Sequence, residues 1–358
     1  PSPLRLRGSE MCLTTEAWEA KMDKAAEVSA ANYSFFLGAT RDNIDEIINA
    51  DYTRIPGIKL FMGSSTGGML LDDEAGLEKL FSRFPHVIAC HAESEPIIRA
   101  NRDRLQKIYP DGIPVELHSE IRSREACFEA TRKAVELARR TGARLHVMHV
   151  TTEEELGLFT PGNIERKQIT AETCPHYLCF TSESVAKTGG LTKCNPAIKA
   201  DSDRRALLRA VADGRIDVIA TDHAPHLLSQ KLNGTALTAA SGMPSVQFAL
   251  PVMLQLARKG YFTIEDVVEK MCAAPARLYN ISRRGHLRQG YMADIVIIDP
   301  DADYTISSAD VISTCGWTPF DGMRLNFRVE QTWINGQPAY VDGEFTGLQT
   351  ALPVRFDV

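Results

Sequence analysis

Short apolar runs alternate with longer amphipathic stretches along most of the chain. Six runs are continuous enough to be buried strands: Tyr33–Ala39, Gly57–Gly63, His86–Glu93, Arg144–Thr151, Gln168–Pro175 and Asp217–Pro225. Helical spacing of apolar positions is found at Thr14–Ala31, Asp72–Arg83, Arg122–Thr141 and Asp203–Asp213. Strands that are apolar on both faces and are followed by helices form parallel sheets covered on both sides. The pattern predicts an α/β fold of the TIM-type (β/α)8 barrel class, with about six of the eight strands present.

The pattern changes near Gly285. Two more helices are predicted around Val246–Lys259 and Ile264–Met271. Short β-like runs separated by Gly, Asp and Pro turns then follow, at Asp294–Ile298, Arg328–Ile334 and Pro338–Val341. We therefore expect two domains, an incomplete barrel over residues 1–284 and a small β-sandwich domain over residues 285–358.

The composition is that of an ordinary globular protein, with 44% hydrophobic and 24% charged residues. The formal net charge of −6 argues against nucleic-acid and membrane-surface partners, which favour a basic face. No apolar run approaches the roughly 18–20 residues of a membrane span. The eight cysteines form no CxxC pair and several lie inside apolar runs, as reduced, buried cytosolic cysteines do. We therefore expect a cytoplasmic protein.

Polar side chains stand near the ends of four predicted strands. They are Lys59 in GIKLFMG, His91 in VIACHAE, His149 in HVMHVTT and Asp222 in VIATDHAPH. One histidine at a strand end is more often a hydrogen-bonded core residue than a ligand. Four polar residues in matching positions indicate a shared site, because the carboxyl ends of barrel strands converge on one face. Two imidazoles and a carboxylate suit Zn²⁺.

Lys59 has two interpretations. An ammonium cannot bind a cation, and burying it without a partner is costly. It is either a strand lysine paired with a carboxylate, or a lysine whose amine has added CO₂. The second product is a carbamate, whose two oxygens can bridge two metal ions.

Five segments, in this order and spacing, resemble the dihydroorotases among the cyclic amidohydrolases: GIKLFMGSSTG, HAES, ETCPHYL, KCNPAIK and ATDHAPH. GYMADIVIID resembles the segment that returns such chains to their β-sandwich. The resemblance implies reversible hydrolysis of dihydroorotate to N-carbamoyl-L-aspartate, a step of pyrimidine synthesis. It implies a small-molecule substrate and leaves a homodimer open. ATDHAPH and KCNPAIK favour dihydroorotase, while a hydantoinase or allantoinase stays as the alternative.

The resemblance also implies a binuclear zinc site. Carboxylated Lys59 would bridge the two Zn²⁺ ions, and His91 and His149 would bind the second ion. Asp222 would be both a metal ligand and the general base that passes a proton to the leaving nitrogen.

Three further positions are implied to face the substrate, namely Asn195, His226 and Gly242 in the Ala240–Ser245 stretch. Glu172 and His176 are expected to support the site without acting in catalysis directly. The remaining histidines are expected to be structural: His86, His118, His146, His223 and His286.

Two motifs of this family are missing from the sequence. Its barrels begin with a strand ending in His-x-His, usually followed by an arginine, and with a second strand ending in a Pro-Asn-Thr-like motif. None of the nine histidines precedes His86, and no His-x-His occurs. The chain is then a fragment of an active enzyme, a truncated natural product without activity, or a non-catalytic scaffold that binds partners. Because the four ligand positions are intact, we favour the fragment and expect the 358-residue chain to be inactive as given.

A barrel lacking two strands should be open. We expect the first and last predicted strands to face each other across a gap without a hydrogen-bonded ladder. Apolar side chains should be exposed there, among them Phe35, Leu37, Val218 and Ile219.

Overall fold

A six-stranded parallel sheet forms the centre of the computed structural model, which describes residues 11–63, 71 and 73–358. The strand order follows the sequence, β1–β2–β3–β4–β5–β6. The strands are β1 (Leu37–Gly38), β2 (Ile58–Met62), β3 (Val87–Ala92), β4 (Arg144–Val147), β5 (Ile169–Thr173) and β6 (Val218–Ile219). The predicted α/β barrel class is confirmed. The irregular start of the sequence and the SSTG part of the GIKLFMGSSTG segment lie outside the described residues.

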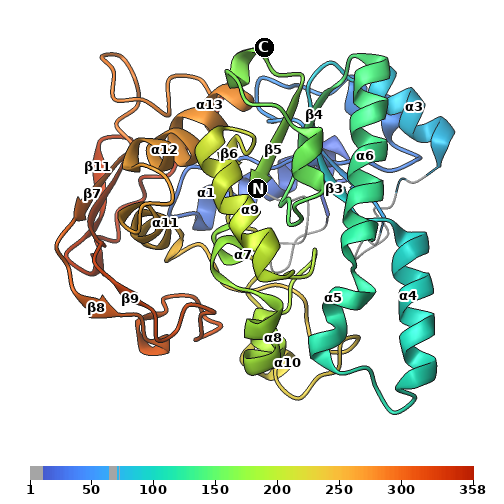
Figure 1. Ribbon diagram of the computed structural model, residues 1–358. Coiled ribbons are helices and arrows are strands. Elements are labelled where there is room, and N and C mark those ends of the chain that lie inside the picture. The colour runs from blue at the N-terminus through green and yellow to red at the C-terminus, as the bar shows by residue number, and fades with distance from the viewer. Residues whose placement is uncertain (1–10, 64–70, 72) are drawn as a thin grey trace.

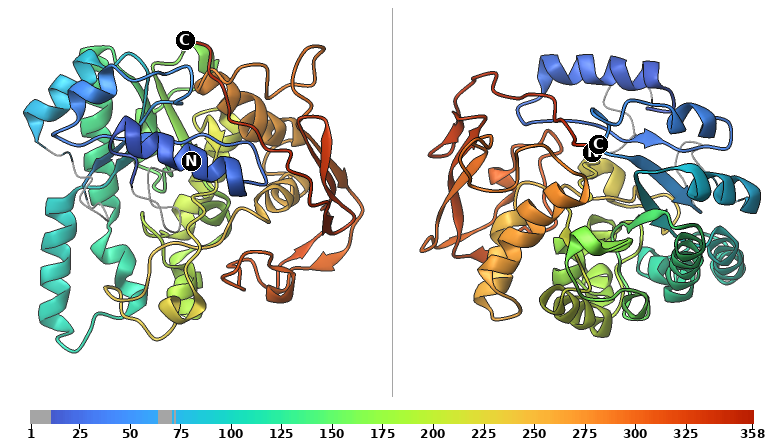
Figure 2. Two further views of the ribbon diagram at one scale, coloured as in Figure 1. Left: turned by 180° about the vertical axis from the view of Figure 1, so that it is seen from behind. Right: turned by 90° about the horizontal axis from the view of Figure 1, so that it is seen from above.

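Helices are arranged around the outside of this sheet (Figure 1 and the right-hand view of Figure 2). They are α1 (Thr15–Val28), α2 (Ile44–Ile48), α3 (Glu74–Arg83), α4 (Glu95–Ile108), α5 (His118–Ile121), α6 (Arg124–Thr141), α7 (Pro175–Cys179), α8 (Ser182–Thr188), α9 (Asp201–Asp213), α10 (Leu228–Lys231), α11 (Ala249–Arg258), α12 (Ile264–Val268) and α13 (Ala274–Leu278). The four helices predicted before residue 214 are all present, with ends that differ by up to three residues.

Caps explain where these helices begin and end. Thr14 accepts a hydrogen bond from the Ala17 amide at 3.1 Å, and Ser123 accepts one from the Ala126 amide at 3.2 Å. Helix α6 ends at Gly142, whose φ of 82° is left-handed. Each cap supplies a partner to a main-chain group that the helix itself cannot satisfy.

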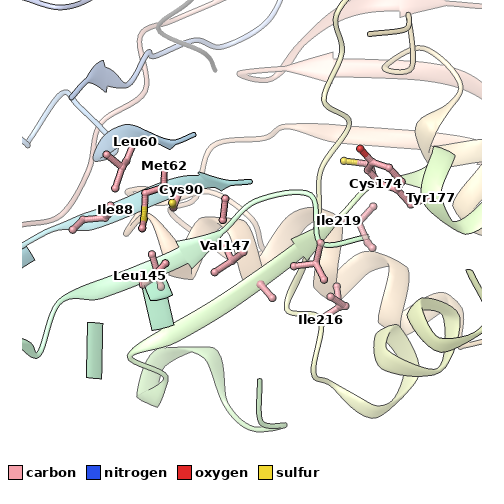
Figure 3. Packing of buried hydrophobic residues seen from close by; sticks show 14 of the residues in the cluster. Leu60, Met62, Ile88, Cys90, Leu145, Val147, Cys174, Tyr177, Ile216 and Ile219 are labelled. Carbon is pink, nitrogen blue, oxygen red and sulfur yellow. The ribbon is translucent and has the colours of Figure 1, made fainter. Parts of the chain in front are cut away.

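The strands are apolar on both faces because both faces are covered. Every residue of β2 and β3 is buried. Figure 3 shows side chains of successive strands packed together, among them Leu60, Ile88 and Leu145. This packing belongs to one large hydrophobic core that runs from α1 to the helices after β6.

The two outer strands of the sheet are shorter than their apolar runs. β1 covers two residues of the Tyr33–Ala39 run, and β6 covers two residues of the Asp217–Pro225 run. Each has a ladder on one side, β1 with β2 and β6 with β5. A strand that pairs on one side receives fewer main-chain hydrogen bonds and ends earlier.

Within the described residues no ladder joins β1 to β6, as predicted. The predicted exposure of apolar side chains beside this opening is wrong. Leu37 is 0%, Val218 4% and Ile219 5% exposed, and Phe35 is partly buried.

Two later segments of the chain lie beside the two outer strands. The amide of Tyr33 donates to the Leu352 carbonyl at 3.2 Å, and the Val354 amide donates to the Tyr33 carbonyl at 2.9 Å. The C-terminal segment thus lies beside the start of β1 (Figure 2). Val218 packs with Ala274 and Leu278 of α13.

The chain switches to antiparallel pairing after residue 290, as predicted. β7 (Ile295–Asp299), β10 (Arg328–Ile334), β11 (Gln337–Val341) and β12 (Glu344–Phe345) form a sheet in the order β12–β11–β10–β7. β8 (Tyr304–Thr305) pairs with β9 (Arg324–Leu325). Both sheets lie on one side of the barrel (Figure 1), which fits a small C-terminal domain.

The cysteines are all free thiols. Six are buried, as expected for cysteines inside apolar runs, while Cys179 is partly buried and Cys272 is exposed. No helix in the described part of the chain is long and apolar enough to cross a membrane.

Gly57 is required by its surroundings at the start of β2. Its φ is 149°, and a Cβ at this position would lie 2.3 Å from the Val87 carbonyl oxygen. We expect Gly57→Ala to lower the free energy of unfolding by about 3 kcal/mol, because strain and a clash with main chain add together. Gly142→Ala, with a left-handed φ but nothing within 4 Å, should cost only about 1 kcal/mol. Urea denaturation measures both, and equal losses would contradict this explanation.

Candidate active site

Lys59 is buried within the sheet, with 5% of its surface exposed. It is the second residue of β2 and pairs with Ala89, so the expected placement at the strand end is wrong. Its Nζ lies 2.6 Å from Met148 Sδ and 4.7 Å from the centre of the Phe61 ring. Within the described residues Lys59 forms no ion pair at contact distance, but the carboxylates of Asp222 and Glu172 act on it electrostatically.

The electrostatic environment favours the neutral amine of Lys59. Burial lowers its pKa, while the nearby carboxylates of Asp222 and Glu172 act in the opposite direction. CO₂ adds to an amine only in its unprotonated form. A buried lysine with a lowered pKa is therefore suited to become a carbamate.

His91 and His149 face each other at the ends of neighbouring strands. His91 is in β3 and His149 follows β4, and both are buried. His91 Nδ1 lies 3.0 Å from His149 Nε2. Burial lowers the pKa of both imidazoles, so both are neutral, the form that binds metals.

Two of the predicted site residues have unusual main-chain conformations. His149 has a φ of 39° and Asp222 a φ of 42°, in the left-handed region that non-glycine residues rarely adopt. Each follows the end of a parallel strand, β4 or β6. Such conformations cost energy and cluster at functional sites.

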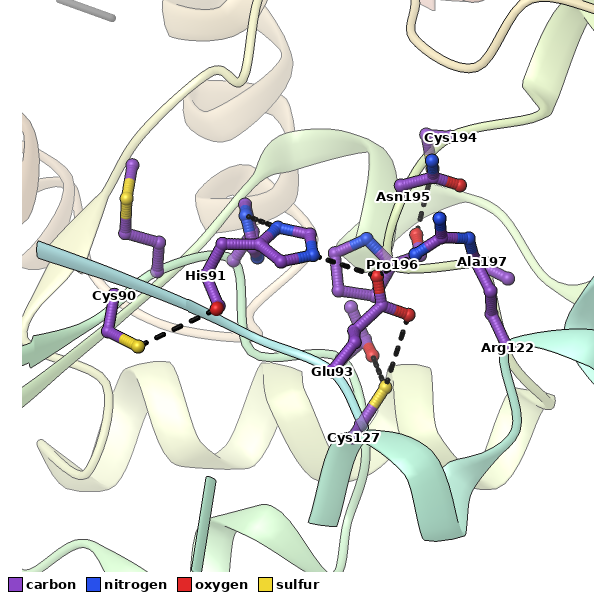
Figure 4. A network of polar contacts seen from close by, with 12 residues as sticks. Cys90, His91, Glu93, Arg122, Cys127, Cys194, Asn195, Pro196 and Ala197 are labelled. Carbon is purple, nitrogen blue, oxygen red and sulfur yellow. Dashed lines mark hydrogen bonds and ion pairs between the residues drawn. The ribbon is translucent and has the colours of Figure 1, made fainter. Parts of the chain in front are cut away.

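A buried carboxylate stands behind His91. Glu93 is fully buried, with Oε2 2.9 Å from His91 Nε2 and in an ion pair with Arg122 (Figure 4). The contact with His91 is not aligned as a hydrogen bond. Burial would raise the pKa of Glu93, but Arg122 and His91 lower it to about 2. An ionised carboxylate here favours a proton on His91 Nε2, which leaves Nδ1 free to act as a ligand.

Asp222 lies apart from the histidine pair. It is partly buried, and burial raises its pKa to about 6 while Lys59 lowers it. Lys59 also acts electrostatically on His91 and His149. His91, His149 and Asp222 therefore lie near the Lys59 side chain.

These four residues are not a single cluster of metal ligands. No three His, Cys, Asp or Glu side chains among the described residues lie close enough together to hold one metal ion. The histidine pair by itself fits a metal. Two nitrogens bound to a tetrahedral Zn²⁺ stand about 3.3 Å apart, close to the separation of these two atoms.

The three residues expected to face substrate lie in segments that contact one another. His226 Nε2 lies 3.0 Å from the Ser241 carbonyl, and the Gly242 amide donates to the Lys193 carbonyl at 2.9 Å. Gly242 has a φ of 127°, and a Cβ there would lie 2.6 Å from Ala224 Cβ. Asn195 follows two residues after Lys193.

Several contacts of the site were not predicted from the sequence. His118, expected to be structural, has Nε2 2.9 Å from Asn195 Oδ1. His146 Nε2 lies 3.0 Å from Glu172 Oε2, and Glu172 in turn acts on Lys59 and Asp222.

No direct role in catalysis was predicted from the sequence for Glu93 or His176. Glu93 belongs to the HAES segment, and an acidic residue directly after a buried run was the available signal. His176 is fully buried, and neither ring nitrogen has a partner among the described residues. Burial lowers the pKa of His176 to about 3, so the ring is neutral.

A cavity of the described structure lies away from these residues. Its volume is about 320 Å³, and it is found near the starts of β5 and β6, where Asn163, Asp217 and Arg277 are among its lining residues. Chemistry in parallel barrels occurs at the opposite ends of the strands. We therefore do not assign this cavity to the site.

Glu93→Gln is expected to lower the free energy of unfolding by about 3 kcal/mol at neutral pH, because the buried Arg122 loses its carboxylate. The pKa of Glu93 is about 2, against 4.5 for the unperturbed group. Its stabilisation is therefore complete above about pH 5 and is lost as the pH falls toward 2.

Urea denaturation of wild type and variant at pH 7 and at pH 3 tests this expectation. The difference between the two proteins should shrink at the lower pH. Glu330→Gln, at an exposed position of β10, is the control and should change stability by less than about 0.5 kcal/mol. If the difference in free energy of unfolding between wild type and Glu93→Gln did not depend on pH, Glu93 would not stabilise the fold through its ionised carboxylate.

Known proteins resemble this chain over most of its length. Residues 94–339 match a sequence family described as the amidohydrolase family. An allantoinase from Streptomyces avermitilis is 31% identical over 332 residues, 91% of this chain and 73% of that protein. A dihydroorotase from Halobacterium salinarum is 34% identical over 272 residues, 74% of this chain and 60% of that protein. The structure of an L-hydantoinase from Arthrobacter aurescens superposes with a TM-score of 0.89 at 25% identity, covering 96% of this chain and 78% of that one.

Proposed function

The chain belongs to the amidohydrolase family, and on this premise we propose that it is a metal-dependent hydrolase of cyclic amides whose substrate is dihydroorotate. The observation that carries the proposal is the pair of facing, buried, neutral imidazoles, His91 and His149, beside the buried amine of Lys59. The reverse reaction would close N-carbamoyl-L-aspartate into the ring.

The residues present fit a zinc ion. His91 Nδ1 and His149 Nε2 would hold it, and a carbamate on Lys59 and the carboxylate of Asp222 would supply oxygen ligands. When bound, such ions lower the pKa of water toward neutrality and polarise the amide carbonyl.

Asp222 is the group that moves the proton. Its carboxylate has a pKa of about 6, within the range of a general base that works near neutral pH. It takes a proton from the attacking water and gives it to the ring nitrogen that leaves. Glu172 and Lys59 act on this carboxylate in opposite directions, the first raising and the second lowering its pKa.

Three segments would hold the substrate. The Asn195 side chain offers an amide, His226 offers a ring held by the Ser241 carbonyl, and the loop around Gly242 offers main-chain groups. Together these groups present both donors and acceptors, which a cyclic amide with two N–H and two C=O groups requires.

A second substrate is favoured by a specific observation. The allantoinase from Streptomyces avermitilis matches more of this chain than the Halobacterium salinarum dihydroorotase does, 91% against 74%. Allantoin is therefore the alternative, with hydantoin as a third cyclic amide.

Hydrolysis assays decide between these substrates. They use the zinc-loaded protein, purified as its gene encodes it. Dihydroorotate, allantoin and hydantoin are compared at equal concentration, and N-carbamoyl-L-aspartate is tested for ring closure. We expect the highest kcat/KM with dihydroorotate. A preference for allantoin or hydantoin would move the activity to the alternative. Turnover of none of them, with zinc bound at the histidine pair, would contradict an enzymatic role and favour a scaffold.

A further inference from the structure

Lys231 is a fully buried lysine at the last position of α10. Its Nζ donates three hydrogen bonds, all to main-chain carbonyls. The acceptors are Ala240 at 2.6 Å, Gly242 at 2.6 Å and Lys193 at 2.8 Å. An ammonium group has three N–H donors, so each donor is used.

The three acceptors connect segments that carry the expected substrate contacts. Lys193 precedes Asn195 by two residues, and its carbonyl also accepts the Gly242 amide at 2.9 Å. The Ser241 carbonyl, between the other two acceptors, lies 3.0 Å from His226 Nε2. One side chain thus joins the loop at residues 239–243 to the segment that carries Asn195.

The charge of Lys231 is balanced by these carbonyls and by no ion pair among the described residues. The ring of Trp317 lies 5.8 Å from its Nζ, and Trp317 Nε1 donates to the His226 carbonyl at 2.8 Å. Burial lowers the pKa of Lys231 to about 7. Burying a cation without a carboxylate is costly, and packing alone is better served by an apolar residue.

The surroundings are built around this lysine. A Cβ on Gly190 would lie 2.0 Å from the Lys231 carbonyl oxygen, so a glycine is needed for the main chains to approach. The Ala240 amide donates to the Gln230 carbonyl at 2.9 Å, which brings the loop to the end of α10.

We propose that Lys231 is a positioning residue, whose ammonium holds the loop at residues 239–243 against the segment at residues 193–195 and so sets how Asn195, His226 and Gly242 face the substrate. The expected effect of Lys231 on turnover rests on the proposed function, whereas its expected effect on the loop at residues 239–243 is independent of that function.

Lys231→Met tests the proposal, because methionine has a similar length but offers no donor to the three carbonyls. Hydrogen exchange followed by mass spectrometry reports on the loop. We expect exchange at residues 239–243 and 193–195 to be faster by about tenfold or more. For the cyclic amide that the wild type hydrolyses best, KM should rise by about tenfold or more with a smaller change in kcat, since ground-state and transition-state binding are lost together.

Lys270→Met is the matched control. Lys270 is also buried and donates to the Ile216 carbonyl at 2.7 Å. Ile216 precedes β6, so this contact lies at the opposite end of the sheet. Exchange at residues 239–243 and KM should be unchanged in this variant. Lys231→Gln, which keeps two donors on a shorter side chain, should loosen the loop less than Lys231→Met and serves if the methionine variant does not fold.

Two outcomes would overturn the proposal. One is unchanged exchange of the loop in both Lys231 variants. The other is an increase that is uniform over the whole barrel, with no excess at residues 239–243 and 193–195, which would show a general loss of stability. If the wild type hydrolyses none of the cyclic amides, the proposed function fails, while the exchange measurements still decide the role of Lys231.

Discussion

Asp222→Asn is expected to lower kcat by about a thousandfold or more, because the amide cannot take up the proton of the attacking water. Asparagine keeps the size of the side chain and tolerates the left-handed φ of 42° at this position, so the fold should be retained. Steady-state hydrolysis of the preferred cyclic amide measures the effect. Circular dichroism and urea denaturation check the fold.

The pH profile adds a second test of Asp222. The carboxylate must be ionised to act as a base, so activity is present above its pKa and is lost as the pH falls below it. The pKa is about 6 without metal, and a bound cation would lower it. The acid limb of kcat/KM should therefore lie at or below about pH 6 in the wild type. Asp342→Asn, at an exposed left-handed turn position, is the control and should keep wild-type kcat. A kcat within tenfold of wild type for Asp222→Asn would exclude the role.

His149→Ala is expected to weaken zinc binding by about a hundredfold or more and to reduce hydrolysis to background at low zinc. Removing one imidazole leaves His91 as the one nitrogen ligand of the pair, and even the loss of a residue that only supports a ligand costs 10–100-fold in affinity. Isothermal titration with zinc at pH 7 gives the affinity, and metal analysis after dialysis gives the stoichiometry.

His286→Ala is the control for this experiment. His286 is a partly exposed histidine whose ring lies 6.2 Å from that of Tyr291, far in sequence from the site. Its replacement should leave zinc affinity unchanged. Equal zinc affinity in wild type and His149→Ala would show that the pair is not the binding site.

The order of strands and helices could be predicted because it depends on local patterns. Buried parallel strands are apolar on both faces, and helices have a repeat of 3.6 residues, so both are visible in short windows of sequence. The ends of the outer strands were not predictable in this way. They depend on how many neighbours a strand has, which is a property of the whole sheet.

The burial of β1 and β6 could not be predicted either, because it depends on contacts between residues that are far apart in the sequence. Leu37 and Val218 were expected to be exposed because a barrel lacking its first two strands would be open beside them. Leu352 and Val354, about 320 residues after Tyr33, form hydrogen bonds with it, and α13 packs on Val218. No local pattern indicates such contacts.

The candidate site could be predicted where polar residues interrupt buried strands, but the partners of those residues could not. Lys59, His91, His149 and Asp222 stand out because polar residues are rare in buried strands. Arg122 and Glu93 are 29 residues apart, and Lys231 meets carbonyl groups, which every residue has. The sequence therefore contains no pattern showing that Glu93 pairs with Arg122 or that Lys231 meets these carbonyls.

The position of the metal is the measurement that decides this account. Crystals grown with zinc, with diffraction data collected on both sides of the zinc absorption edge, locate the ion by anomalous scattering. We predict a peak within about 2.0–2.1 Å of both His91 Nδ1 and His149 Nε2, with extra density on Lys59 Nζ for the carbamate. A zinc-saturated protein with no peak between these two nitrogens, or with its peak at other residues, would contradict the account.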